Sequence, residues 1–93
     1  MGSGLFLGPL QQAPVVASDG KSIKLLGSFP TPPVVLLENN VHGYNVIVAS
    51  PAGQDYVIMV PAGTFGSHMI LAVSSGYPDS ECSSVFVDIP APQ

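Results

Sequence analysis

The sequence predicts an all-β protein, a small antiparallel β-sandwich or barrel of roughly six to eight short strands with extended N- and C-terminal arms. Short apolar runs recur between turn signals about every eight to twelve residues, and ten Gly and ten Pro punctuate the chain. No stretch combines the length, periodicity and caps of a helix. Ninety-three residues correspond to one domain, with an expected arm at 1–14, the β-sandwich at 15–89 and a tail at 90–93.

The N-terminal arm contains one apolar cluster, Leu5-Phe6-Leu7. Flanking glycines and a proline limit any strand here to about three or four residues, which is too short to be stable alone. We therefore expect Leu5, Phe6 and Leu7 to dock on their own domain or on a neighbouring subunit, and we count them as assembly contacts.

Two strands are expected before residue 30. Residues 15–17 form a short apolar run that a Ser-Asp-Gly turn signal closes. The second strand spans 22–29, where Ile23 and Leu25 lie on the buried face and Lys24 lies on the other.

The segment 30–33 has three prolines in four residues, so we expect an extended crossing between sheet edges. It leads into 34–37, a continuous apolar run that predicts a strand covered on both faces. Two further strands are expected near the C-terminus, at 67–74 and 84–89, separated by a loop at 75–80.

The clearest local signal is a β-hairpin over 43–63. Its arms are 44–49 and 56–60, and the link 50–54 has Pro and Gly where a type I turn with a bulge needs them. We expect these arms to pair with each other at the centre of the sheet.

Both faces of this hairpin are apolar, whereas an antiparallel sheet with one wet face alternates more strictly between apolar and polar residues. At least one face or edge is therefore expected to be covered by another chain. Ile47, Val57 and Met59 are the expected assembly contacts there.

The charge content supports burial against partners. Charged residues make up 9% of the chain, against about 25% in ordinary soluble domains, and the mean hydropathy is +0.45. These charges are too few to coat a free-standing small globule. A membrane location is the competing explanation, but no run approaches the roughly 20 apolar residues of a membrane-spanning helix.

Composition also disfavours several other classes of function. A net charge of −4 with two lysines argues against nucleic-acid binding, which needs a basic surface. A single cysteine excludes an intrachain disulfide and a cysteine-based zinc site. The first residues lack the basic and apolar regions of a secretory signal.

No motif of catalysis is present, so we expect no enzyme activity, no cofactor and no metal. His42 and His68 are the only histidines, and they lack the spacing of metal ligands or the surroundings of a catalytic triad. A calcium site at Asp79, Glu81 and Asp88 is the weaker alternative, because hard cations prefer several oxygen ligands.

Tyr44 and Tyr56 are the candidate ligand-binding residues. Aromatic side chains with polar edges form sugar-stacking platforms in lectin-like sandwiches. Cross-strand packing of the two rings, on arms expected to pair, is the favoured interpretation.

The segment LLGSFPTPPVVLLENN (25–40), followed by a hairpin with a Pro-Ala-Gly turn, resembles short β-domains of tail and fibre proteins of tailed bacteriophages. The opening Gly4-Leu5-Phe6-Leu7 is similar to small phage tail proteins that begin with a Gly-Leu-hydrophobic strand. The resemblance implies assembly contacts, and no catalytic residues transfer from it.

These observations together predict a non-enzymatic structural subunit of a phage virion, in the tail, tail tip or fibre. Its expected partners are other virion proteins and copies of itself, with no nucleic acid and no membrane. Assembly would take place in the bacterial host cytoplasm. The alternative is a carbohydrate- or receptor-binding β-sandwich module that contacts a glycan or receptor on the host surface.

Overall fold

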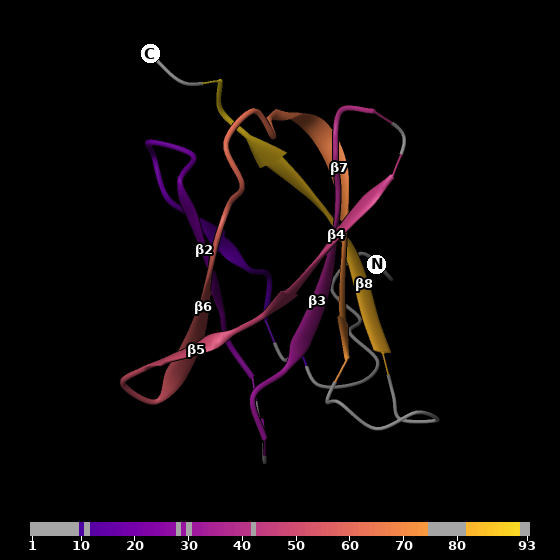
Figure 1. Cartoon of the computed structure of the whole chain (residues 1–93). Coiled ribbons are helices and arrows are strands. Elements are labelled where there is room, and N and C mark those ends of the chain that lie inside the picture. The colour runs from indigo at the N-terminus through magenta and orange to yellow at the C-terminus, as the bar shows by residue number, and fades with distance from the viewer. Residues whose placement is uncertain are drawn as a thin grey trace, which may run out of the picture.

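The described part of the chain forms two four-stranded antiparallel sheets, whose arrangement is drawn in Figure 1. Apolar side chains from both sheets form a core between them. The computed structural model describes residues 10, 12–27, 29, 31–41, 43–74 and 82–91. The described residues contain eight strands and no helix, which confirms the prediction of a small all-β sandwich.

The first sheet has the strand order β1-β2-β6-β5. Its strands are β1 (Val15–Val16), β2 (Ser22–Leu25), β6 (Asp55–Met59) and β5 (Ser50–Ala52). The predicted inward face of β2 is confirmed, since Ile23 and Leu25 have no exposed surface. The strand ends at Leu25, earlier than predicted, and Gly27 forms an isolated bridge with Leu10 instead.

The second sheet has the strand order β4-β3-β7-β8. Its strands are β4 (Tyr44–Val48), β3 (Val34–Glu38), β7 (Gly66–Ser74) and β8 (Cys82–Ile89). Val35 lies opposite Ile47 on β4 and opposite Val73 on β7. β3 is therefore an internal strand of its sheet. The prediction that both faces of this strand are covered is not met within this chain, because Leu36 on its outward face is 40% exposed.

The predicted pairing of 44–49 with 56–60 is wrong. β4 pairs with β3 in the second sheet, and the hairpin partner of β6 is the three-residue strand β5. The chain passes from one sheet to the other at Ala49, which is 4% exposed. Both arms have an alternating apolar pattern that fits several partners, so the local sequence does not select the pairing.

The turn of the observed hairpin differs from the predicted one as well. Ala52 and Asp55 are the last paired residues, so the loop is Gly53-Gln54. Gly53 has a φ of 66° and Gln54 has no positive φ, the pattern of a type II′ turn. Pro51 lies in β5, which is an edge strand. Its lack of an N–H therefore does not remove a hydrogen bond between strands.

The hairpin is also not at the centre of a sheet. β4 and β5 are edge strands, and β6 is internal. The distinction matters for function, because an edge strand leaves one row of backbone hydrogen-bonding groups without a strand neighbour.

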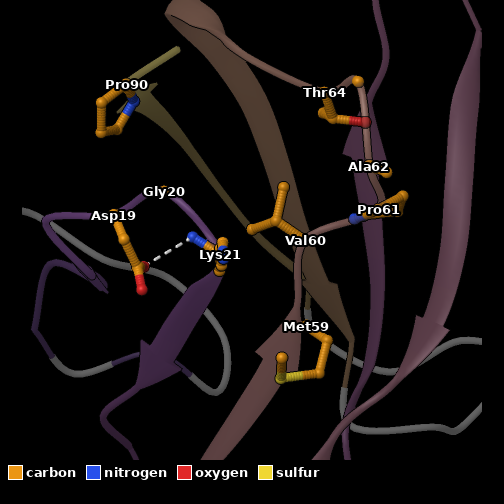
Figure 2. A pocket seen from close by; sticks show the side chains of 10 residues that line it. Asp19, Gly20, Lys21, Met59, Val60, Pro61, Ala62, Thr64 and Pro90 are labelled. Atoms are coloured by element: carbon orange, nitrogen blue, oxygen red, sulfur yellow. Dashed lines mark hydrogen bonds between the residues drawn. The ribbon is translucent and has the colours of Figure 1, made fainter. Parts of the chain in front are cut away.

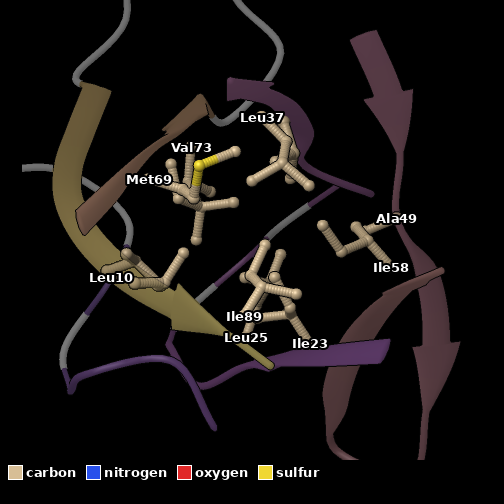
Figure 3. Close-up of a cluster of buried hydrophobic side chains, with 12 residues drawn as sticks. Leu10, Ile23, Leu25, Leu37, Ala49, Ile58, Met69, Val73 and Ile89 are labelled. Carbon is tan, nitrogen blue, oxygen red and sulfur yellow. The ribbon is translucent and has the colours of Figure 1, made fainter. Parts of the chain in front are cut away.

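Side chains from both sheets form the core (Figure 3). Fully burying a Leu, Ile or Val side chain contributes about 1.5–3 kcal/mol, so this cluster is the main source of stability. Leu10, which the sequence places in the N-terminal arm, is 1% exposed and belongs to the core. The buried apolar residues are Leu10, Ile23, Leu25, Val35, Leu37, Ala49, Ile58, Met69, Leu71, Val73, Val87 and Ile89.

A β-bulge interrupts the pairing of β7 with β8. Gly66 lies opposite Ile89 and Met69 lies opposite Val87, so two residues of β7 face one residue of β8. Within the bulge, His68 has a φ of 57°, and its N–H donates to Asp88 Oδ1 at 2.8 Å.

A reciprocal amide contact joins two loops. Asn40, in the turn between β3 and β4, accepts from the N–H of Phe65 at 3.1 Å and donates to its carbonyl oxygen at 2.7 Å. One side chain therefore ties this turn to the segment that leads from β6 into β7.

Candidate functional site

The side of the second sheet that faces away from the core is lined by apolar side chains. Successive residues of a strand point to opposite faces, so the neighbours of buried Val35 and Val87 face outward. We call this surface the outer apolar face. Its exposed members, with their exposed fractions, are Leu36 (40%), Tyr44 (51%), Val46 (69%), Val48 (64%) and Phe86 (68%).

The strand register makes the outer apolar face continuous. Leu36 lies opposite Val46 on β4 and opposite Ala72 on β7, and Phe86 on β8 lies opposite Ile70. Directly opposite residues have Cβ atoms about 4.5–5.5 Å apart. The half-buried Ile70 and Ala72 therefore bridge the exposed side chains of β8 and those of β3 and β4.

β4 turns its more apolar side away from the core. Tyr44, Val46 and Val48 are exposed, while Asn45 and Ile47 on the other side are half-buried. A strand with one solvated face normally shows the reverse, with polar residues outward. Contiguous exposed apolar surface of this kind is characteristic of an interaction site.

Among the residues that the structure describes, few charged groups lie around the outer apolar face. Glu38 directs its carboxylate to β7, where Oε1 accepts the N–H of Ile70 at 3.1 Å. Asp88 is exposed near the end of β8, and its carboxylate accepts a hydrogen bond from the N–H of His68. Both lysines of the chain lie in or directly before β2, in the first sheet.

The hydrogen bonds between β3 and β4 define which residues of β4 face its open edge. The N–H of Ala49 donates to the carbonyl of Pro33 at 3.0 Å, and the N–H of Asn39 donates to the carbonyl of Gly43 at 2.9 Å. Hydrogen-bonded and non-hydrogen-bonded pairs alternate along an antiparallel ladder. The residues of β4 bonded to β3 are therefore those at odd-numbered positions.

The even-numbered residues Tyr44, Val46 and Val48 consequently direct their backbone N–H and C=O groups away from β3. Among the described residues, β3 is the only strand neighbour of β4, and the other edge of β4 is open. We call this row of backbone groups the β4 edge. It lacks the charged side chains, prolines and bulges that normally protect an edge strand from pairing.

The predicted assembly contacts lie in different places. Ile47 is half-buried against the core, so the residues of β4 that face outward are its neighbours. Val57 is half-buried and Met59 is 66% exposed, both in β6 of the first sheet. Leu5, Phe6 and Leu7 lie outside the described residues.

Sequence reasoning missed Leu36, Val46, Val48 and Phe86 as surface residues. Each lies in a strand that the sequence predicted, and their alternation with the inward residues was visible. Both alternating sets are apolar, however, and the pattern by itself does not say which set faces the core.

The two candidate ligand-binding tyrosines do not form one platform. Tyr44 lies on β4 in the second sheet, opposite Glu38. Tyr56 lies on β6 in the first sheet, where it is half-buried and its ring meets that of Phe29 edge-on, with centroids 5.5 Å apart. The predicted cross-strand packing of Tyr44 against Tyr56 is therefore wrong, because the two strands belong to different sheets.

A cavity of about 290 Å³ opens at one end of the sandwich (Figure 2). Ligand sites for small molecules usually span about 300–1,000 Å³ and present convergent polar groups. Here the charged side chains of Asp19 and Lys21 are exposed, and the remaining lining is mostly apolar. The cavity suits an apolar side chain better than a polar substrate. Its lining residues are Asp19, Gly20, Lys21, Met59, Val60, Pro61, Ala62, Gly63, Thr64 and Pro90.

Gly20 allows close packing at the wall of this cavity. Its φ is 72°, and a Cβ atom at this position would lie 2.6 Å from the carbonyl oxygen of Pro90. Only glycine fits both the backbone conformation and the short approach.

The described residues offer little for catalysis or metal binding. They contain no group of three or more His, Cys, Asp or Glu side chains that could hold a metal ion. Within the same residues, every buried side-chain nitrogen or oxygen atom has a hydrogen-bond partner. Two of the three carboxylates in the calcium alternative, Asp79 and Glu81, lie outside the described residues, as does His42.

The part of the chain that the structure describes has no helix long and apolar enough to cross a membrane. No family model matches the sequence, and neither a curated protein nor a solved structure matches it significantly.

Proposed function

We propose that this protein is a non-enzymatic structural subunit whose function is to pack against other protein subunits in an assembly. The observation that supports this most strongly is the outer apolar face. Three of its members, Val46, Val48 and Phe86, are each about two-thirds exposed within a single chain. Burial of such side chains against a partner is the physical basis of assembly that we propose.

Burying apolar surface contributes roughly 25 cal/mol per Å², so the remaining exposed area of one such residue is worth on the order of 1–2 kcal/mol. Five residues therefore supply several kilocalories per mole to an interface, before the entropy of association is subtracted. An isolated chain with 9% charged residues has few means of keeping this surface soluble.

The resemblance of 25–40 to tail and fibre β-domains of tailed bacteriophages supports a virion as the assembly. Other virion proteins and further copies of this chain are then the partners. In this proposal the protein is assembled in the bacterial cytoplasm and resides in the phage tail, tail tip or fibre.

Sedimentation velocity on the purified full chain tests the assembly function. We expect reversible association between micromolar and millimolar concentrations. Val46→Lys should weaken it strongly, whereas Val41→Lys should not. Val41 is the matched control because it is 80% exposed but lies in the turn between β3 and β4, outside the strands that form the outer apolar face. A stable monomer at every concentration would overturn the proposal of self-assembly.

The genes beside this one test the virion assignment independently. A cluster of tail genes around it is the expected arrangement. A location among genes that encode no virion components would count against the assignment to a phage tail.

The alternative, a glycan- or receptor-binding module, now depends on Tyr44. This ring is 51% exposed at one end of β4, and an exposed aromatic ring of this kind can stack on a sugar. The carboxylate of Glu38, the residue opposite Tyr44 on β3, is directed to β7 instead. A glycan array compares the wild-type chain with Tyr44→Ala. Binding that is unchanged by this substitution would exclude the alternative at this position.

A further inference from the structure

We propose that two copies of this chain join through the β4 edge, as an antiparallel pair of β4 strands related by a two-fold axis at Val46. The two second sheets would then form one continuous sheet across the dimer. This inference depends on the proposed assembly function and adds to it the identity of one partner, the contacting strand and the register.

The backbone of β4 specifies a strand as the occupant of this edge. Tyr44, Val46 and Val48 each present one N–H and one C=O away from β3, as the bonds at Ala49 and Asn39 require. Among protein elements, an extended segment is the one that pairs in register with such a row of donors and acceptors. Addition of a strand to an open sheet edge is a common mode of association between proteins.

The arrangement of these groups is self-complementary. With the axis at Val46, this residue lies opposite the partner's Val46, and Tyr44 lies opposite the partner's Val48. The two-fold axis repeats the Tyr44–Val48 pair, so the interface has three pairs in all. Each is a hydrogen-bonded pair, and together they make about six backbone hydrogen bonds. Moving the axis to Asn45 or to Ile47 leaves two residues at one end of each β4 without a strand partner.

The side chains support the same register. Tyr44, Val46 and Val48 of both copies lie on the same side of the joined sheet, where aromatic and β-branched residues form favourable cross-strand pairs. The outer apolar face of each copy also becomes continuous with that of its partner. A larger apolar surface then remains for a further subunit.

The charges do not oppose this dimer. β4 has no charged residue, and the nearest carboxylate, Glu38, lies opposite Tyr44 at one end of the strand. In the antiparallel pair the two Glu38 side chains are at opposite ends and three strand spacings apart, which places them about 20 Å from each other. Salt screens charges at that distance, since the Debye length is about 8 Å at physiological ionic strength.

The other strand edges are less suited to self-pairing. β1 has two residues, and β5 has three with Pro51 among them. β8 is long enough, but it contacts β1 of the other sheet and has the carboxylate of Asp88 in the bulge. β4 is the edge strand that combines five residues, no charge and an exposed apolar side.

Cysteine cross-linking tests the register directly. In the full chain with Cys82→Ser, which removes the single native cysteine, Val46→Cys places two thiols on the axis. Opposite Cα atoms of a hydrogen-bonded pair are about 5.5 Å apart, within the range of roughly 4.4–6.8 Å for a disulfide. We expect mild oxidation to convert most of this variant to a covalent dimer.

Val48→Cys in the same background is the matched control, because Val48 is as exposed as Val46 (64% against 69%). In the proposed register its two copies are four residues apart along the strands, about 14 Å, so they should not cross-link. Equal cross-linking of both variants would overturn the proposal, as would no cross-linking of Val46→Cys in a chain that still associates.

Phe86→Lys separates edge pairing from stacking of two outer apolar faces. Phe86 lies on the same face as Val46 but on β8, three strands from the β4 edge. We expect this variant to keep the wild-type association in sedimentation velocity. Loss of the dimer would show that the faces stack instead and would overturn edge pairing. A wild-type chain that never associates would overturn the proposed self-assembly as well.

Discussion

Replacing Leu10 with alanine tests whether the segment before β1 is part of the folded domain. The sequence places Leu10 in an arm, but its side chain is 1% exposed and its backbone forms a bridge with Gly27. It packs in the same cluster as Leu25 and Ile89. The substitution removes the branched end of the side chain and leaves a cavity between the sheets.

The expected loss of stability is large for a domain of this size. A buried Leu→Ala change lowers the free energy of unfolding by about 2–5 kcal/mol. At roughly 0.05–0.15 kcal/mol per residue, the whole chain has about 5–14 kcal/mol. With a loss of about 3 kcal/mol and an m-value of about 1.5 kcal/mol per molar urea, the unfolding midpoint should fall by about 2 M.

Equilibrium unfolding in urea, followed by circular dichroism, measures this shift. Leu36→Ala is the control, because it makes the same chemical change at a residue that is 40% exposed on the outer apolar face. We expect it to lower the free energy of unfolding by about 1 kcal/mol or less. A loss below about 0.5 kcal/mol for Leu10→Ala, or equal losses for the two variants, would refute the assignment of Leu10 to the core.

Three further predictions concern the loops and the bulge. Asn40→Ala removes both hydrogen bonds that tie the β3–β4 turn to the segment before β7, and we expect a loss of about 1–2 kcal/mol in urea unfolding. Gly20→Ala should destabilise more than Gly53→Ala. Both glycines have a positive φ, but a Cβ atom meets the backbone of Pro90 only at Gly20. His68→Gly should leave the thermal midpoint unchanged or raise it, because the φ of 57° is strained for a residue with a side chain.

Each of these has a clear contrary result. A wild-type midpoint for Asn40→Ala would mean that the amide contact contributes nothing in solution. Equal losses at Gly20 and Gly53 would attribute the effect to φ alone, without the clash. A marked loss for His68→Gly would mean that the imidazole itself stabilises the bulge, for example through its edge-on contact with the ring of Phe86.

The sequence was sufficient for several features that depend on neighbouring residues. The all-β class follows from short apolar runs between turns, and the inward side of β2 follows from the charge of Lys24 between Ile23 and Leu25. The need for Gly at position 53 was likewise predictable, because a reversal of the chain there needs a residue that accepts positive φ. Each of these depends on the local conformational preference of a few consecutive residues.

The partner of β4 and the direction of its side chains were decided only by tertiary structure. Residues 44–48 are apolar on both sides, so the choice between pairing with 56–60 and pairing with β3 has no local signature. Pairing with β3 places Ile47 against the core beside Val35 and leaves Val46 on the surface. Strand pairing is set by the joint burial of residues distant in sequence, and that burial also determines which side of β4, and which edge, remains for another chain.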